Sequence, residues 1–444
     1  MIDSPSGAPR PDWRLGFAVQ MIVAGLYVTV VYATRPTVTY RALSLGATTL
    51  EIGLVQSAFS LLPALLAVAI GRAVDRLGGS RFMIAATAVL AVGGLIAAYS
   101  GGLVILAVAQ VAMGLGQIIY LVAGQALVAN VGPRDERELR FGTYATVVSA
   151  GQLAGPAIAA AILGGGTVAV AATLVASATP GPPIGAGTAL ASGGLLPDSA
   201  EGIVFLVATM ITLVAFGLSC FLPSLTRRGD RPRTPPPEGG PGTLSVARNV
   251  LRRPGMLSAM FVSIVVISTL DAIVAYLPAY GSVSGLSVGL VGALLSIRAG
   301  AALVSRVFMT RLIARLGRGR LLATSMAMAA LSLLVLPFVR SDTVLLGLMV
   351  VVGMGLGLVQ PMTIAWVANR SPRRERGTAL GVRITGNRIA LLIAPTLLGG
   401  IAGTAGISAI FIVMGLSLGL AAAVALVTGY DEPVGRPDVT PDDR

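Results

Sequence analysis

Twelve long hydrophobic runs, separated by short polar segments, dominate the pattern of this chain. Each run has about 20 predominantly apolar residues, the length at which a helix crosses the hydrocarbon core of a bilayer. The pattern therefore predicts an all-α integral membrane protein with twelve transmembrane helices. The first six runs cover residues 15–34, 50–71, 82–100, 103–130, 141–163 and 203–222, and the second six cover residues 256–279, 288–310, 321–338, 344–366, 378–400 and 407–427.

The longest polar interruption lies between the sixth and seventh runs, and the sequences on its two sides are related. Arg76 corresponds to Arg315 and Pro156 to Pro395, each 239 positions later. Two parallel repeats of six helices predict two pseudo-symmetric bundles with a binding site between them near the middle of the membrane. The predicted units are a cytoplasmic segment 1–14, a first half 15–222, a cytoplasmic linker 223–254, a second half 255–428 and a cytoplasmic tail 429–444.

The first half carries an additional segment at about 164–200, before its last hydrophobic run. This segment is built mainly from Ala, Gly, Thr, Val and Pro. We interpret it as an exposed loop on the extracytoplasmic side. The alternative is a re-entrant or interfacial piece around residues 168–178.

Basic residues are distributed unevenly between the two ends of the predicted helices. The net charge of +13 comes from arginine, and arginines are concentrated after the second, fourth, eighth and tenth runs. The opposite segments hold only Arg35, Arg41 and Arg340. Because arginine-rich short loops stay in the cytoplasm, we expect both termini to be cytoplasmic. Topology explains the basic charge, and no nucleic-acid partner is expected.

The composition also restricts the chemistry that the chain can perform. It has no His and one Cys, and its basic residues do not include Lys. These absences exclude histidine-ligated metal sites, Ser-His-Asp or Cys-His catalysis and a lysine Schiff base. We therefore expect neither an enzyme nor a bound cofactor or metal.

A motif follows the second run, where residues 71–81 read Gly-Arg-Ala-Val-Asp-Arg-Leu-Gly-Gly-Ser-Arg. This segment matches the loop motif G-x-x-x-D-R-x-G-x-x-R, and the chain thereby resembles the major facilitator superfamily over essentially its whole length. The resemblance implies the major facilitator fold and a latch at the cytoplasmic gate, in which the acid faces the positive end of another helix. The second copy has Ala314 in place of the acid, so we expect an asymmetric latch. The predicted latch residues are Gly71, Asp75, Arg76, Gly78 and Arg81.

The fifth run is similar to a motif of drug/proton antiporters, on the spacing of Gly142, Gly151, Gly155 and Pro156. The glycines at 151 and 155 form a small-xxx-small packing face, and the proline frees a backbone carbonyl so that the helix can bend. The resemblance implies export, and generic helix packing is the alternative. In the fourth run Gln110 stands where the antiporter pattern has an arginine, so the proton-coupling group is expected elsewhere.

Charged residues inside the predicted helices of the second half are the candidates for proton coupling. Asp271, Arg298 and Arg388 lie near the middle of their runs, where each charge costs roughly 2.5 to 3.5 kcal/mol. We predict Asp271 as the proton site, with Arg298 or Arg388 as its partner or as an anion-binding group. A permanently paired structural network is the alternative. Arg306 and Arg383 lie nearer the cytoplasmic ends and are expected to snorkel or to join the gate.

Uncharged polar residues are the candidates for the substrate pathway. In the fourth run they recur at three- and four-residue intervals, which places them on one helix face. Interhelical hydrogen bonding is the alternative role for each glutamine. A mixed aromatic, Gln and Met cavity suits lipophilic organic molecules. The predicted pathway residues are Tyr27, Tyr32, Gln110, Gln117, Tyr120 and Gln360.

We therefore interpret the chain as a secondary active transporter that exports small lipophilic organic compounds in exchange for protons by alternating access. One alternative is proton-linked uptake of an organic anion or metabolite. The other is a transport-inactive membrane receptor or scaffold. The lysine-free, Ala/Gly/Arg/Pro-rich composition is typical of GC-rich bacteria and favours the cytoplasmic (inner) membrane. We expect a monomer whose partners are a small-molecule substrate, protons and the lipid bilayer.

Overall fold

The computed structural model describes residues 13–131, 136–164, 197, 199–226, 251–371 and 376–428. Within these ranges twelve helices are long and apolar enough to cross a membrane, so the predicted all-helical membrane architecture is confirmed. The tail 429–444, and most of the segment 1–14, of the insertion 164–200 and of the linker 223–254, lie outside the described residues.

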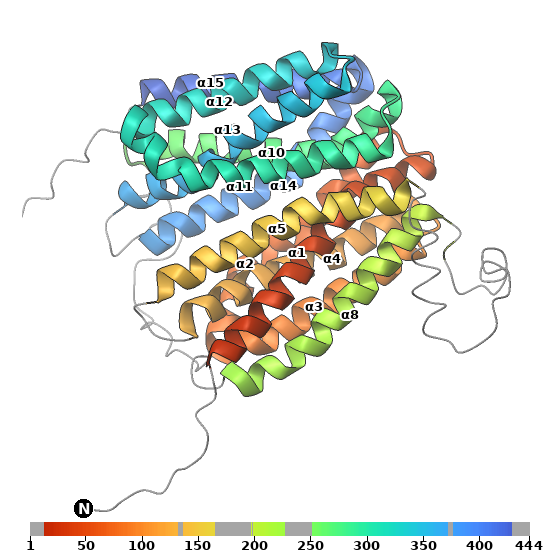
Figure 1. The fold of residues 1–444 in the computed structure, drawn as a ribbon, viewed down its shortest axis with the longest axis vertical. Coiled ribbons are helices and arrows are strands. Elements are labelled where there is room, and N and C mark those ends of the chain that lie inside the picture. Colours follow the sequence, from red (N-terminus) through yellow and green to blue (C-terminus); the bar gives the residue numbers. More distant parts are fainter. Residues whose placement is uncertain are drawn as a thin grey trace, which may run out of the picture.

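Each half contributes six long helices (Figure 1). The first half consists of α1 (Trp13–Ser44), α2 (Thr49–Leu77), α3 (Gly79–Ala98), α4 (Leu103–Asn130), α5 (Arg137–Leu163) and α8 (Ala200–Thr226). The second half consists of α10 (Met256–Ser284), α11 (Val288–Leu316), α12 (Arg318–Val335), α13 (Asp342–Asn369), α14 (Arg376–Ala405) and α15 (Ser408–Val427), with a 3-10 turn at Leu336–Phe338 after α12.

In both halves the second helix ends at a glycine with a positive φ angle. Gly78 ends α2 with φ 91° and its N–H donates to the carbonyl of Val74, and Gly317 ends α11 with φ 75° and donates to Ile313. Both glycines occupy a backbone region that L side chains rarely adopt, so the residue type is set by the turn. The turn at Gly78 therefore recurs 239 positions later at Gly317.

Helix α1 is longer than its hydrophobic run and continues to Ser44. The hydrophobic pattern predicts that Arg35 and Arg41 lie beyond the end of the first helix, and that prediction is wrong. Pro36 lies within the helix, and Arg35 is buried with 8% of its surface exposed. A polar residue beside a proline ends a hydrophobic run in the sequence, but it does not end a helix whose polar side chain finds buried partners.

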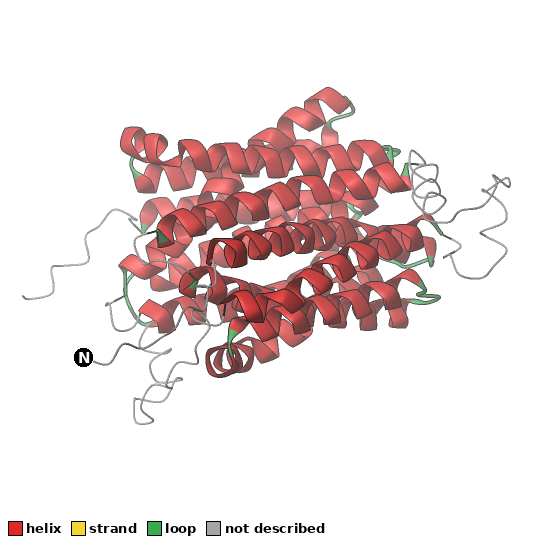
Figure 2. Cartoon of the chain, turned by 60° about the horizontal axis from the view of Figure 1, so that its bottom comes forward, coloured by secondary structure: helices red, strands yellow, loops and turns green. Residues whose placement is uncertain are grey.

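The two groups of six helices lie against each other across the molecule. In Figure 1, α1–α8 form the lower group and α10–α15 the upper group. Figure 2 shows the helices of both groups running roughly alongside one another. Helix pairs from different halves make the contacts between the groups, chiefly α2 with α14, α5 with α11 and α1 with α10.

The halves are joined most closely at the end where α1 finishes and α2 begins. Thr49 Oγ1 donates to the carbonyl of Gly399 at 3.1 Å, and the hydroxyls of Ser57 and Thr396 are 2.9 Å apart. Thr39 Oγ1 donates to the carbonyl of Ala275 at 2.6 Å. This end lies opposite the arginine-rich turns after α2 and α11, and we refer to it as the outer end, after the orientation that the arginine distribution predicts. The structure is therefore closed at its outer end.

Candidate functional site

A cavity of about 100 Å³ lies between the halves. Helices α1, α4 and α5 supply one wall, and α10, α11 and α13 supply the other, which is the position that the repeat predicts for a binding site. The lining residues with polar side chains are Tyr32, Arg35, Gln117, Gln152, Asp271, Arg298, Arg306 and Gln360.

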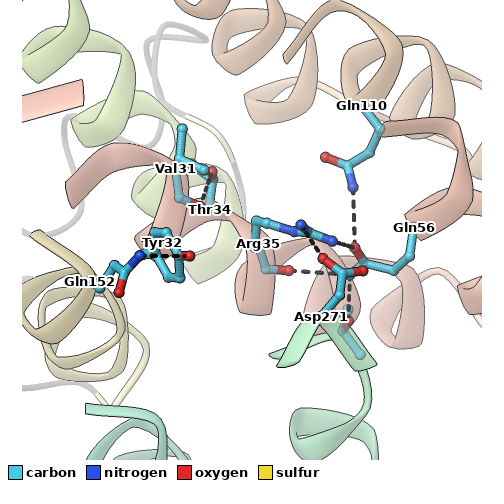
Figure 3. A network of polar contacts seen from close by, with 9 residues as sticks. Val31, Tyr32, Thr34, Arg35, Gln56, Gln110, Gln152 and Asp271 are labelled. Carbon is cyan, nitrogen blue, oxygen red and sulfur yellow. Dashed lines mark hydrogen bonds and ion pairs between the residues drawn. The ribbon is translucent and has the colours of Figure 1, made fainter. Parts of the chain in front are cut away.

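An ion pair at this cavity joins the two halves (Figure 3). Arg35 Nη1 on α1 lies 2.5 Å from Asp271 Oδ1 on α10, and the two side chains are only 9% and 10% exposed. The guanidinium of Arg35 also lies over the ring of Phe59, 4.5 Å from its centroid. Because both charges are removed from water, each depends on the other for its stability.

Two glutamines of the first half, Gln56 and Gln110, extend this network by hydrogen bonds. Gln56 Nε2 donates to the carbonyl of Arg35 at 3.2 Å and to Thr39 Oγ1 at 2.9 Å, while Arg35 Nη2 donates to Gln56 Oε1 at 3.5 Å. Gln110 Nε2 donates to the same Gln56 oxygen at 3.4 Å. Gln110 therefore supports the ion pair through Gln56, as Figure 3 shows.

The arginine that pairs with Asp271 is not one of the two predicted partners. Arg298 lines the cavity without an ion pair to Asp271. Arg388 forms no ion pair with Asp271 and is not among the lining residues. The missed residue, Arg35, had one available signal: it is flanked by Thr34 and Thr37, polar residues that a membrane helix accommodates by bonding its own carbonyls.

Arg306, which we expected to snorkel or to join the gate, makes its hydrogen bonds inside the protein. It lines the cavity, its Nε donates to the carbonyl of Gly357 at 3.1 Å, and its Nη1 donates to Ser149 Oγ on α5 at 3.2 Å. The second hydrogen bond crosses between the halves. Arg383 is buried and its Nη2 donates to Thr363 Oγ1 at 3.1 Å, so it is held inside the second half.

The predicted pathway residues separate into two groups. Tyr32, Gln117 and Gln360 line the cavity, and the hydroxyl of Tyr32 accepts a bond of 3.0 Å from Gln152. Tyr27 and Tyr120 stack on each other with ring centroids 4.0 Å apart, inside the core of the first half. The structure thus brings three of the six residues to the cavity wall. Gln110 is connected to the wall indirectly, through its hydrogen bond to Gln56, which is in turn bonded to Arg35.

The glycines of the α5 motif lie against α1. A Cβ on Gly155 would lie 2.7 Å from the carbonyl oxygen of Thr29, and a Cβ on Gly151 would lie 3.0 Å from the N of the same residue. A Cβ on Gly142, in contrast, would meet nothing within 4 Å. Pro156 lies next to Gly292 of α11, on the line where the halves meet.

The latch motif lies at the end of α2 opposite the outer end. Arg76 and Arg81 are exposed there, and a Cβ on Gly71 would meet nothing within 4 Å. The side chain of Asp75 lies outside the described residues.

Comparisons with known proteins agree with this architecture. The sequence profile described as Major Facilitator Superfamily matches residues 20–313 and 284–444. No curated protein sequence matches the chain.

Solved structures match the chain over nearly its whole length at low sequence identity. A bacterial homolog to the human lysosomal transporter Spinster, in an inward-facing and occupied conformation, has a TM-score of 0.74 at 13% identity, covering 95% of this chain and 97% of that one. A POT family transporter in complex with 5-aminolevulinic acid has a TM-score of 0.72 at 14% identity, with coverages of 96% and 98%. The nucleoside transporter NupG, as a D323A mutant, has a TM-score of 0.71 at 11% identity, with coverages of 93% and 99%. At these identities the likeness shows the fold.

Proposed function

Because the chain belongs to the Major Facilitator Superfamily and is a membrane transporter of that kind, we propose that it couples movement of a small organic compound to protons. The compound binds in the cavity between the halves and crosses by alternating access. The protein works as a monomer in the cytoplasmic membrane with both termini in the cytoplasm. It carries its substrate without converting it chemically.

The observation that carries this proposal is the ion pair between Arg35 and Asp271. Among the described residues that line the cavity, Asp271 is the one acid, and the sequence contains no His that could take its place. Protonation of Asp271 removes the negative charge that holds Arg35 to α10. Proton binding therefore weakens a contact between the halves, which is the property that a coupling site requires.

Alternating access also requires that the outer end, which is closed in this structure, can open. The contacts of α2 with α14 and of α1 with α10 hold this end shut, and the ion pair lies beside them on α1 and α10. Release of the pair favours separation of the outer end, so that the cavity opens to the other side. The proton thus biases a two-state element rather than acting on the substrate directly.

For the direction of transport we propose export, supported by the close packing of Gly151 and Gly155 against α1. Uptake of an organic anion is the second candidate, and the three arginines of the cavity wall favour it.

The cavity of about 100 Å³ is smaller than the roughly 300 Å³ at which drug-sized pockets begin. Size and charge therefore support a small polar substrate better than a large lipophilic one.

The test is a transport assay in energised everted vesicles with a panel of neutral, cationic and anionic organic compounds. We expect at least one compound to release protons through the wild type, and Asp271→Asn to abolish that release. Glu51→Gln is the matched control, because Glu51 closes the capping box of α2 outside the cavity and Gln preserves that role. Substrate-dependent release that persists in Asp271→Asn would refute the coupling role. A partner that binds while no compound is transported in either direction would favour the receptor or scaffold reading.

A further inference from the structure

The cavity wall carries an excess of positive charge. Its charged lining residues are Arg35, Arg298, Arg306 and Asp271. Since Asp271 is already paired with Arg35, Arg298 and Arg306 of α11 face the cavity without an acid of their own among the described residues. An uncompensated guanidinium in a low-dielectric site is costly unless an anion occupies the site for part of the cycle.

Arg298 shows this imbalance most clearly. It is 94% buried, its Nε has no hydrogen-bond partner, and no ion pair or hydrogen bond joins it to another described residue. It lines the cavity together with Tyr32 and Arg306. A permanently structural arginine in a membrane interior is expected to be bonded to polar groups of the protein, as Arg383 is to the hydroxyl of Thr363.

Tyr32 of α1 lines the same cavity as these two arginines. Arg298 and Arg306 are eight residues apart on α11 and both reach the cavity wall. Gln152 donates to the hydroxyl of Tyr32 at 3.0 Å. The cavity wall therefore carries hydrogen-bond donors from α5 and α11 together with one aromatic hydroxyl.

The internal repeat argues that these arginines do not belong to the scaffold. The arginines of the loop motif recur in both halves. Arg76 and Arg315, for example, are 239 positions apart. At the same offset Arg298 corresponds to Phe59 and Arg306 to Ala67, which are apolar. The six-helix bundle can therefore be built without either arginine.

We infer that Arg298 and Arg306 form an anion-binding subsite that holds the carboxylate or phosphate group of the transported compound beside Tyr32. The planar guanidinium group matches the two oxygens of such an anion with parallel hydrogen bonds. Gln117 and Gln360, which line the same cavity, contact the uncharged remainder of the compound. This inference rests on the proposed function and specifies the substrate as a small organic anion.

The test measures binding to the purified full-length protein in a nonionic detergent, where no lipid phosphate competes. The probes are succinate and benzoate as carboxylates, glycerol 3-phosphate as a phosphate, succinamide and benzamide as neutral counterparts, and benzylamine as a cation. We expect at least one anion to raise the melting temperature while its neutral counterpart does not. The carboxylate and phosphate arms identify which anionic group the subsite prefers.

Substitutions then assign the binding to α11. Arg298→Gln is expected to weaken anion binding at least tenfold, since a charge-assisted hydrogen bond is lost, and Arg298→Lys to retain part of the affinity. Arg311→Gln, which removes the same charge from an exposed position of α11, should leave binding unchanged. Without ligand, Arg298→Gln should melt at the same temperature as the wild type or higher, because an uncompensated buried charge has been removed.

Several outcomes overturn the inference: no anion binds, binding is unchanged in Arg298→Gln, or that variant melts lower without ligand, as loss of a structural arginine would cause. Proton-coupled transport of a neutral or cationic compound that Arg298→Gln leaves intact would also overturn it while the proposed function stands. Anion binding that depends on Arg298, without proton release in the vesicle assay, would support the subsite and refute proton-coupled export.

Discussion

The carboxylate oxygen Oδ1 of Asp271 on α10 lies 2.5 Å from Nη1 of Arg35 on α1, so that a buried ion pair connects the two six-helix halves. The carboxylate belongs to the second repeat and the guanidinium to the first. Rigid-body rocking of one half against the other must therefore stretch or break this contact. The pair is at once a structural contact and a barrier to the conformational change.

A double-mutant cycle tests how far the two charges depend on each other. Arg35→Gln and Asp271→Asn each leave one buried charge without its partner and are expected to lower the free energy of unfolding by about 3 kcal/mol. The double variant should lose clearly less than the sum of the two, because no unpaired charge remains. Thermal or denaturant unfolding in detergent measures all three. Additive losses would show that the two side chains are not energetically coupled, and Arg311→Gln serves as a charge-removal control outside the pair.

The spans and the repeat could be predicted because both follow from local sequence. A run of about 20 apolar residues meets the thickness of the bilayer, and Gly78 and Gly317 mark the same turn in each copy. The residues at the cavity could be predicted only in part. The sequence shows which polar residues lie in each helix, but the rotation of the helices decides which of them reach the cavity. The polar residues of predicted helices that do so include Tyr32, Gln117, Gln360, Asp271, Arg298 and Arg306.

The partner of Asp271 could not be predicted, for a physical reason. Arg35 and Asp271 are 236 positions apart and lie in different halves, and no periodicity within one helix determines which faces of two bundles meet. The hydrophobic run also stops at Arg35, whereas α1 continues because Gln56 and Asp271 satisfy that side chain. A buried polar group with partners from other helices is thus hidden from a hydropathy pattern.

The glycines of the α5 motif provide a second prediction. Gly155→Ala should destabilise the protein by about 1 to 3 kcal/mol, since the added Cβ would lie 2.7 Å from a backbone carbonyl oxygen that cannot move aside. Gly142→Ala, in the same helix, should be neutral or stabilise by up to about 1 kcal/mol, because its Cβ meets nothing and alanine favours the helix. Melting temperatures of the two variants give the comparison. Equal effects would mean that close packing on α1 does not explain the motif.

The closure of the outer end can be weakened at Gly53. A Cβ at this position of α2 would lie 2.5 Å from the carbonyl oxygen of Pro395 on α14, so Gly53→Ala should push the two helices apart and favour opening of the outer end. The readout is alkylation of a single cysteine at position 57, made by Ser57→Cys in a Cys220→Ser background. We expect faster labelling in Gly53→Ala than in Gly217→Ala, whose added Cβ would meet nothing within 4 Å. Unchanged labelling would show that contact between α2 and α14 does not limit opening.

The same end can be locked by a disulfide, which tests whether opening is required for transport. The hydroxyl oxygens of Ser57 and Thr396 are 2.9 Å apart across the halves, so cysteines at these two positions lie within disulfide range. In a Cys220→Ser background the oxidised double-cysteine variant should lose transport and regain it with a reductant. It should keep binding its substrate, since the cross-link lies outside the cavity wall. The single-cysteine variants control for the substitutions, and full transport by a protein shown to be cross-linked would mean that the outer end stays closed throughout the cycle.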